Sequence, residues 1–188
     1  SCSHSGTGHA ALPDPRAVDK SVPEYKNPFH PSTYAHFVAR KDYRKTYDVY
    51  KDDTLLNRQP KKSRKIFVCL DEQRGQYLVD GLVAMDFPLS SGVKAYPTKT
   101  GDYAVISKKE DHTSNLYGKM YDAEGKCINY NAESTDPIPE GGRFDGSPMP
   151  YWQRLTNAGL GLHVGKVRRH PVSHGCVRLP RNVAEILY

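Results

Sequence analysis

The residues best suited to chemistry lie in a short segment near the C-terminal end of the sequence. Cys176 follows Gly175, and His163 stands thirteen residues upstream of the cysteine, at the end of an apolar run. A thiol nucleophile needs a base, N–H donors for an oxyanion, and room for a carbonyl to approach. Gly175 leaves room beside the thiol, and the N–H groups of His174, Gly175 and Cys176 can converge on an oxyanion. The pattern indicates nucleophilic catalysis with His163 as the base.

The protonation state of the thiol follows from the same pair. An adjacent imidazole can lower a thiol pKa from about 8.5 to about 6, which raises the thiolate fraction at pH 7 from about 3% to about 90%. We therefore expect His163 to hold Cys176 largely as a thiolate.

Two alternatives use the same segment. It contains four residues of zinc-ligating type, namely His163, His170, His174 and Cys176. His170 and His174 have helical spacing, but Pro171 and Gly175 argue against a helix there, so the two imidazoles need not share a face. The second alternative is that Cys176 is a buried structural thiol and His174 a loop residue. On composition alone, this second alternative is favoured over catalysis.

The segment also resembles a known family. Residues 173–178, Ser-His-Gly-Cys-Val-Arg, resemble the S-H-G-C-[IV]-[RN] signature of L,D-transpeptidases, the YkuD-type domains, in the subgroup with a short loop between histidine and cysteine. Further resemblance lies in residues 97–103, 112–117, 149–156 and 161–163. It spans about residues 64–188 and does not cover residues 1–63. The fold that it implies is mainly β, an L,D-transpeptidase-like β-sandwich of mixed sheets with a few short helices, here with an N-terminal extension.

The sequence departs from the family pattern in three places. Lys99 stands where the family usually has proline, which makes that loop less rigid. Residues 168–170, Arg-Arg-His, replace the Pro-Gly-Tyr that related sequences tend to carry between base and nucleophile. The sequence also stops at Tyr188, before the closing strand of most relatives, so we expect either a missing terminal strand or an N-terminal segment that covers that sheet edge.

The resemblance implies a role for each residue of the site. Cys176 is the nucleophile, His163 is the base, and the main-chain carbonyl of Val164 orients the imidazole. His174, Gly175 and Cys176 line the oxyanion hole, and Ser173 supports the loop. Substrate-binding roles fall to Arg178, whose fork suits a carboxylate, and to Tyr151 and Trp152, which flank the donor peptide.

The reaction implied is acyl transfer on peptidoglycan stem peptides. A thioester forms at Cys176 with release of D-Ala, and an amine acceptor resolves it, either in 3-3 cross-linking or in protein anchoring. The alternatives are an L,D-carboxypeptidase that hydrolyses the same bond and a catalytically idle wall-binding module. No metal or organic cofactor is implied, and cell wall biogenesis and cell shape are the processes served.

The charge of the chain agrees with an anionic partner. The 188 residues carry 27 Lys and Arg against 21 Asp and Glu, a formal net charge of +6. The basic run of residues 61–65 lacks the interleaved aromatic side chains of single-strand binders, so we expect no nucleic acid. No apolar stretch approaches the roughly 20 residues of a membrane span. We expect a monomer in the periplasm of a bacterial cell envelope.

The N-terminal residues 1–63 predict a tether and a partly helical extension. Cys2, followed by Ser and Gly, resembles what remains after removal of a lipoprotein signal and would allow a lipid anchor; an arbitrary sequence boundary explains it equally well. A helix is predicted from Ser32 to before Pro60, since Ser is a favourable cap and apolar residues follow at helical spacing.

Residues 64–188 predict the catalytic domain. Short β-rich runs separated by turns predict strands at 66–70, 76–79, 82–85 and 103–107. Asp80-Gly81 predicts a hairpin turn, residues 122–148 a long surface excursion rich in Gly and Pro, and residues 180–188 a short helix. Cys69 is expected to be a small buried hydrophobe, and a bridge between Cys69 and Cys127 is left open.

Overall fold

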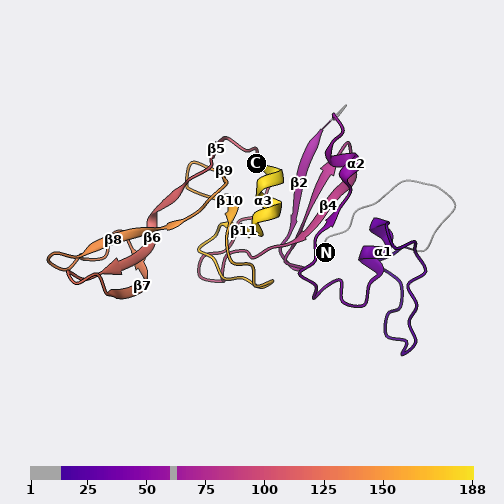
Figure 1. The fold of residues 1–188 in the computed structure, drawn as a ribbon, viewed down its shortest axis with the longest axis horizontal. Coiled ribbons are helices and arrows are strands. Elements are labelled where there is room, and N and C mark those ends of the chain that lie inside the picture. Colours follow the sequence, from indigo (N-terminus) through magenta and orange to yellow (C-terminus); the bar gives the residue numbers. More distant parts are fainter. Residues whose placement is uncertain (1–13, 60–62) are drawn as a thin grey trace. The chain divides into compact units, whose positions relative to one another are not determined.

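The computed structural model describes residues 14–59 and 63–188, which divide into two compact units (Figure 1). The first unit runs to Ser91 and includes Val167–Val172, and the second contains Gly92–Lys166 and Ser173–Tyr188. The described residues form three β-sheets and few, short helices, so the predicted mainly β fold is confirmed. Within these residues no helix is long and apolar enough to cross a membrane.

The first unit is built on an antiparallel sheet with strand order β1-β4-β3-β2. Its strands are β1 (Tyr50–Lys51), β2 (Arg64–Cys69), β3 (Arg74–Val79) and β4 (Leu82–Pro88). Asp80 and Gly81 link β3 to β4 with φ angles of 51° and 84°, a conformation that Asp tolerates and Gly adopts freely. The predicted hairpin turn is therefore confirmed.

A buried ion pair joins the N-terminal segment to this sheet. Arg74 Nε donates to Asp86 at 2.6 Å, and both side chains are almost fully buried. The hydroxyl groups of Tyr34 and Tyr43 donate to the same carboxylate at 2.7 and 2.8 Å. Buried charges are tolerated only when paired and hydrogen-bonded, so this network fixes the segment that carries the two tyrosines.

The long helix predicted from Ser32 to before Pro60 is wrong. The structure has two short helices, α1 (Tyr34–Ala39) and α2 (Asp53–Leu56), and the α1 cap is Thr33, whose hydroxyl accepts the His36 N–H. Side chains from upstream occupy carbonyls near the end of α1: Asn27 donates to His36, Lys20 to Val38 and Tyr25 to Ala39. These tertiary hydrogen bonds satisfy carbonyls that a continuing helix would have used.

The second unit contains a mixed sheet with strand order β11-β10-β9-β5. Its strands are β5 (Ser107–Lys109), β9 (Trp152–Arg154), β10 (Gly161–Val164) and β11 (Val177–Leu179). Strands β10 and β11 are parallel and the other pairs antiparallel. The strand predicted at 103–107 is wrong, because the chain is irregular until β5. The predicted final helix is confirmed as α3 (Arg181–Leu187).

A three-stranded antiparallel sheet, order β7-β6-β8, completes the second unit. It consists of β6 (Thr113–Tyr121), β7 (Cys127–Glu133) and β8 (Arg143–Pro148). Residues 122–148 lie largely at the surface, as predicted, but they form two strands that the sequence did not indicate. Its glycines serve close strand approach, since a side chain at Gly118 would overlap the carbonyl of Asp145. The Cys127 thiol is free, which excludes a bridge to Cys69. Cys69 is buried, as predicted, but it is disulfide-bonded rather than a free thiol.

Two features proposed from the sequence lie outside the described residues. Cys2 and its tether fall in residues 1–13, and part of the basic run falls in residues 60–62.

Candidate active site

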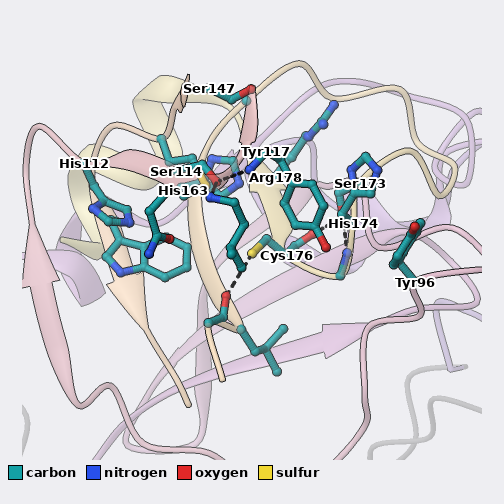
Figure 2. Close-up of a pocket in the computed structure, with 18 of the residues that line it drawn as sticks. Tyr96, His112, Ser114, Tyr117, Ser147, His163, Ser173, His174, Cys176 and Arg178 are labelled. Carbon is teal, nitrogen blue, oxygen red and sulfur yellow. Dashed lines mark hydrogen bonds between the residues drawn. The ribbon is translucent and has the colours of Figure 1, made fainter. Parts of the chain in front are cut away.

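Two adjacent parallel strands position the nucleophile and the base. Leu162 on β10 pairs with Val177 on β11, and both side chains are buried in the core. Because side chains alternate along a strand, His163 and Cys176, each one residue away from this pair, face the opposite side. Figure 2 shows His163, Cys176 and Arg178 together in one pocket. The strand pairing brings residues thirteen positions apart to one side of a sheet.

The pocket has a volume of about 840 Å³ and lies entirely within the second unit. It gathers most of the residues singled out from the sequence: Trp152, His163, Val164, Ser173, His174, Gly175, Cys176 and Arg178. Tyr151 is not among the lining residues. Its ring meets that of Tyr188 with centroids 5.4 Å apart, so this packing, rather than substrate contact, accounts for its position.

The orientation and protonation of His163 are fixed by its surroundings. Its Nδ1 lies 2.8 Å from the carbonyl oxygen of Val164. A carbonyl only accepts, so Nδ1 carries the proton and Nε2 is the basic nitrogen. Burial lowers the pKa of His163 to about 4, with smaller effects of the Arg178 and His112 charges, while the Val164 hydrogen bond acts in the opposite direction. The imidazole is neutral at pH 7 and free to take a proton.

The Cys176 thiol is also held in its neutral form. Burial raises its pKa, opposed by the Gly161 N–H and by the charges of Arg178 and Arg154. The thiol donates to the carbonyl of Gly159 at 3.4 Å. The resting thiolate expected from the sequence is therefore wrong, because desolvation disfavours the charged form of both partners. The proton must leave the sulfur during attack.

The loop before Cys176 is held by Ser173. Its hydroxyl donates to the Cys176 carbonyl at 2.5 Å and accepts the Gly175 N–H at 3.2 Å. Gly175 has a φ of 111°, which a side chain would strain. Among the hydrogen bonds of the described residues, none uses the N–H of His174 or Cys176. These two donors, rather than that of Gly175, remain for an oxyanion.

Three further residues support this loop, and sequence reasoning did not single them out. The Thr98 hydroxyl donates to the Gly175 carbonyl at 2.6 Å and accepts the Gly92 N–H at 2.8 Å. The rings of Tyr96 and Tyr117 lie 4.7 and 4.4 Å from the His174 ring, centroid to centroid. All three residues are labelled among those that line the pocket in Figure 2. Thr98 and Tyr117 fall within segments of family resemblance, which was the available signal. Nothing in the sequence marked Tyr96.

Trp152 packs beside the base. It is buried, and its ring lies 6.0 Å from the His163 ring and 4.9 Å from the His112 ring, centroid to centroid. A side chain at Gly161 would overlap the indole. The tryptophan therefore limits the space in which the imidazole can move.

A metal site finds no support in the described part of the chain. No group of three or more His, Cys, Asp or Glu there is arranged to hold a metal ion. The zinc alternative weighed from the sequence thus has no assembled ligand set among these residues.

Comparisons with known proteins give one family. The profile of the L,D-transpeptidase catalytic domain (YkuD) matches residues 63–188. No curated protein is significantly similar in sequence.

Similar solved structures are L,D-transpeptidases. One from Stackebrandtia nassauensis is 24% identical, with a TM-score of 0.47, over 70% of this chain and 52% of that one. The catalytic domain from Enterococcus faecium is 28% identical, with a TM-score of 0.46, over 67% and 88%. An imipenem complex of another L,D-transpeptidase is 23% identical, with a TM-score of 0.44, over 62% and 49%. The chain thus spans about half the length of the Stackebrandtia protein.

Proposed function

Because the chain belongs to the L,D-transpeptidase (YkuD) family, we propose that it transfers peptidoglycan stem peptides to an amine through a thioester at Cys176. The observation that carries this proposal is the pairing of β10 with β11. It places a thiol and an imidazole of fixed tautomer in one pocket. Nucleophile, base and orienting group are the parts that cysteine acyl transfer requires.

Acylation begins with the neutral pair. The Cys176 sulfur attacks the carbonyl carbon of the third stem residue while its proton moves to Nε2 of His163. The S–C bond forms, and the carbonyl oxygen becomes an oxyanion between the N–H groups of His174 and Cys176. The C–N bond to the terminal D-Ala then breaks, and the imidazolium returns its proton to the departing amine. The thioester and free D-Ala are the products.

In deacylation an acceptor amine is the nucleophile, and the Cys176 sulfur is the leaving group. The acceptor amine attacks the thioester carbonyl, and His163 takes one of its protons. The C–S bond breaks, the new amide forms, and the proton on His163 returns to the Cys176 sulfur. Water in place of the amine would release a tripeptide, which is the carboxypeptidase outcome.

Location and partners belong to the same proposal. Because peptidoglycan lies in the cell envelope, a protein that acts on it is located there, and we infer that the compartment is the periplasm. We also infer that the protein is a monomer and that it serves cell wall biogenesis and cell shape. Cys2 is proposed as the site of a lipid anchor, and residues 1–63 and 64–188 as extension and catalytic domain. The intact mass of the N-terminal peptide of the natively produced protein tests the anchor.

Incubation with defined disaccharide tetrapeptides and analysis of the products tests the reaction. Cross-linked dimers with released D-Ala support transfer, and tripeptides alone support hydrolysis. The Cys176→Ala variant is the control and should give neither product. If the native protein gives neither product, and intact mass shows no imipenem adduct, the protein is a catalytically idle wall-binding module instead of an enzyme.

A further inference from the structure

The chain between β10 and β11 includes a segment that belongs to the first unit. Val167–Val172, called the connecting segment below, group with the first unit, whereas both strands lie in the second. The chain therefore leaves the second unit after the base and re-enters it at Ser173, shortly before Cys176. Residues of the first unit hold the connecting segment by hydrogen bonds.

Both ends of the connecting segment are bound to two serines that lie just after β4. The Arg168 N–H donates to the hydroxyl of Ser90 at 2.8 Å, and the Val172 N–H donates to the carbonyl of Ser91 at 2.8 Å. Both serines are buried. Hydrogen bonds to buried groups are costly to break, because the group that is left cannot bind water instead. The ends of the connecting segment are thus fixed to the first unit.

The middle of the connecting segment is bound by the N-terminal extension, which lies outside the part of the chain that the family profile matches. The Tyr47 hydroxyl donates to the carbonyl of Arg168 at 3.2 Å. The Arg169 guanidinium donates through Nη2 to the carbonyl of Arg44. The chain between the base and the nucleophile is therefore held by residues that the family profile does not contain.

Arg169 is held in an unfavourable state. Its φ is 57°, a left-handed conformation that is uncommon for residues other than glycine. Burial lowers the pKa of its guanidinium, and the charge of Arg74 acts in the same direction. Its buried Nε has no hydrogen-bond partner among the described residues. Backbone strain of this kind persists only where the surroundings enforce it, and it gathers at functional sites. These features indicate a role for Arg169 beyond stability.

We propose that Arg169, held by Arg44 and Tyr47 of the N-terminal extension, positions the loop that carries Cys176, so that fast acyl transfer requires the extension. All three are positioning residues, because they act through the chain and do not touch the reacting atoms. This inference rests on the proposed function.

One peptide bond separates the connecting segment from the loop that carries the thiol. Val172 ends the segment, and Ser173 follows it. Ser173 donates to the Cys176 carbonyl at 2.5 Å and accepts the Gly175 N–H at 3.2 Å. A shift of the connecting segment therefore shifts Ser173 and, with it, the His174 and Cys176 N–H groups that remain for an oxyanion. Acyl transfer slows when such a donor is displaced.

The test compares two reactions of the Cys176 thiol in the full chain, both followed by intact mass. Acylation by a disaccharide tetrapeptide passes through an oxyanion, whereas alkylation by iodoacetamide, a displacement at a methylene carbon, does not. In Arg169→Met, which removes the donors, kcat for acylation should fall about 10- to 100-fold with KM unchanged, the range for a hydrogen bond to a charged group, and alkylation should change less than about twofold. Arg169→Lys should recover part of the loss.

Matched variants show whether the effect is specific to these contacts. Tyr47→Phe loses the hydrogen bond to the Arg168 carbonyl, so acylation should slow about 2- to 10-fold. Tyr25→Phe loses a similar bond to the Ala39 carbonyl elsewhere in the extension and should leave acylation unchanged. Arg168→Met removes an exposed charge beside Arg169 but keeps the main-chain hydrogen bonds, and it should also have no effect.

The outcomes separate this inference from the proposed function. Unchanged acylation in Arg169→Met, or equal losses of acylation and alkylation, would overturn the positioning role while leaving acyl transfer intact. If Arg169→Met does not fold, the exposed Tyr47 decides: equal acylation in Tyr47→Phe and Tyr25→Phe would overturn the role. If the tetrapeptide does not acylate native protein whose thermal unfolding shows it folded, the proposed function fails, and this inference fails with it.

Discussion

The ionisable groups inside the two units differ in their charge state and in their partners. In the first unit, Arg74 and Asp86 are charged, and Tyr34 and Tyr43 complete their hydrogen bonds. In the second, His163 is buried and Cys176 is half-buried, neither forms an ion pair among the described residues, and desolvation holds both in their neutral forms against the nearby charges of Arg154 and Arg178 on the thiol. The first arrangement closes off further chemistry and fixes the chain. The second leaves a thiol and a base that react when a substrate arrives.

The largest expected effect breaks the reactive pair. His163→Ala removes the base while Cys176 remains, and acylation by a tetrapeptide should fall by about 10⁴-fold, as in other nucleophile–base systems. Quenched-flow intact mass gives the rate, and an unchanged thermal midpoint would show that the fold is retained. A loss of less than about tenfold would mean that another group accepts the proton.

The paired arrangement is broken by Asp86→Ala. It leaves Arg74 buried without its carboxylate and frees two tyrosine hydroxyls, so the free energy of unfolding should fall by about 3–5 kcal/mol. Urea unfolding measures it. Asp42→Ala breaks an exposed pair with Arg40 and should cost no more than about 1 kcal/mol. Equal losses in the two variants would remove the contrast between buried and exposed pairs.

The neutral imidazole predicts how stability depends on pH. The pKa of His163 falls from its ordinary value of 6.5 to about 4 in the folded chain, so the unfolded chain binds the extra proton between these values. This contribution, on the order of 3 kcal/mol, is present above pH 6.5 and is lost as pH falls toward 4. Urea unfolding at several pH values from 4 to 7 gives the free energy of unfolding at each pH. This free energy should rise less steeply with pH in His163→Gln than in the native protein. Identical slopes would contradict the assignment.

The smallest effect concerns the loop that carries the thiol. Thr98→Val removes the hydroxyl that binds the Gly175 carbonyl and the Gly92 N–H, so the loop loses two hydrogen bonds. Acylation should slow by about tenfold, since one misplaced donor or acceptor is worth about 1–2 kcal/mol. Thr100→Val, at an exposed position two residues further on, should have no effect. Matched rates for the two variants would show that the loop does not depend on Thr98.

The sequence predicted the reacting residues better than their environment. The signature around Cys176, the turn at Asp80-Gly81 and the final helix depend on local residue types, and local patterns indicate them. The protonation of the Cys176–His163 pair depends on burial, which the local pattern does not contain. Arg154 lines the pocket because β9 pairs with β10, where Arg154 lies opposite Gly161. This pairing joins segments that are brought together only by the fold.

The failed predictions have different causes. The long helix from Ser32 does not form, because side chains from upstream segments bind the carbonyls near the end of α1, and there tertiary contacts override the local preference. Strands β7 and β8 were not predicted, because the glycines and prolines of residues 122–148 indicate turns. In β7 the alternation of Ile128, Tyr130 and Ala132 with polar residues was the available signal for a strand.

The most direct test is the mass of the protein quenched in acid during turnover of a tetrapeptide donor. We predict a covalent tripeptidyl adduct that maps to Cys176, is lost in Cys176→Ala, and forms far more slowly in His163→Ala. Product formation without an adduct, or an adduct on another residue, would contradict this mechanism.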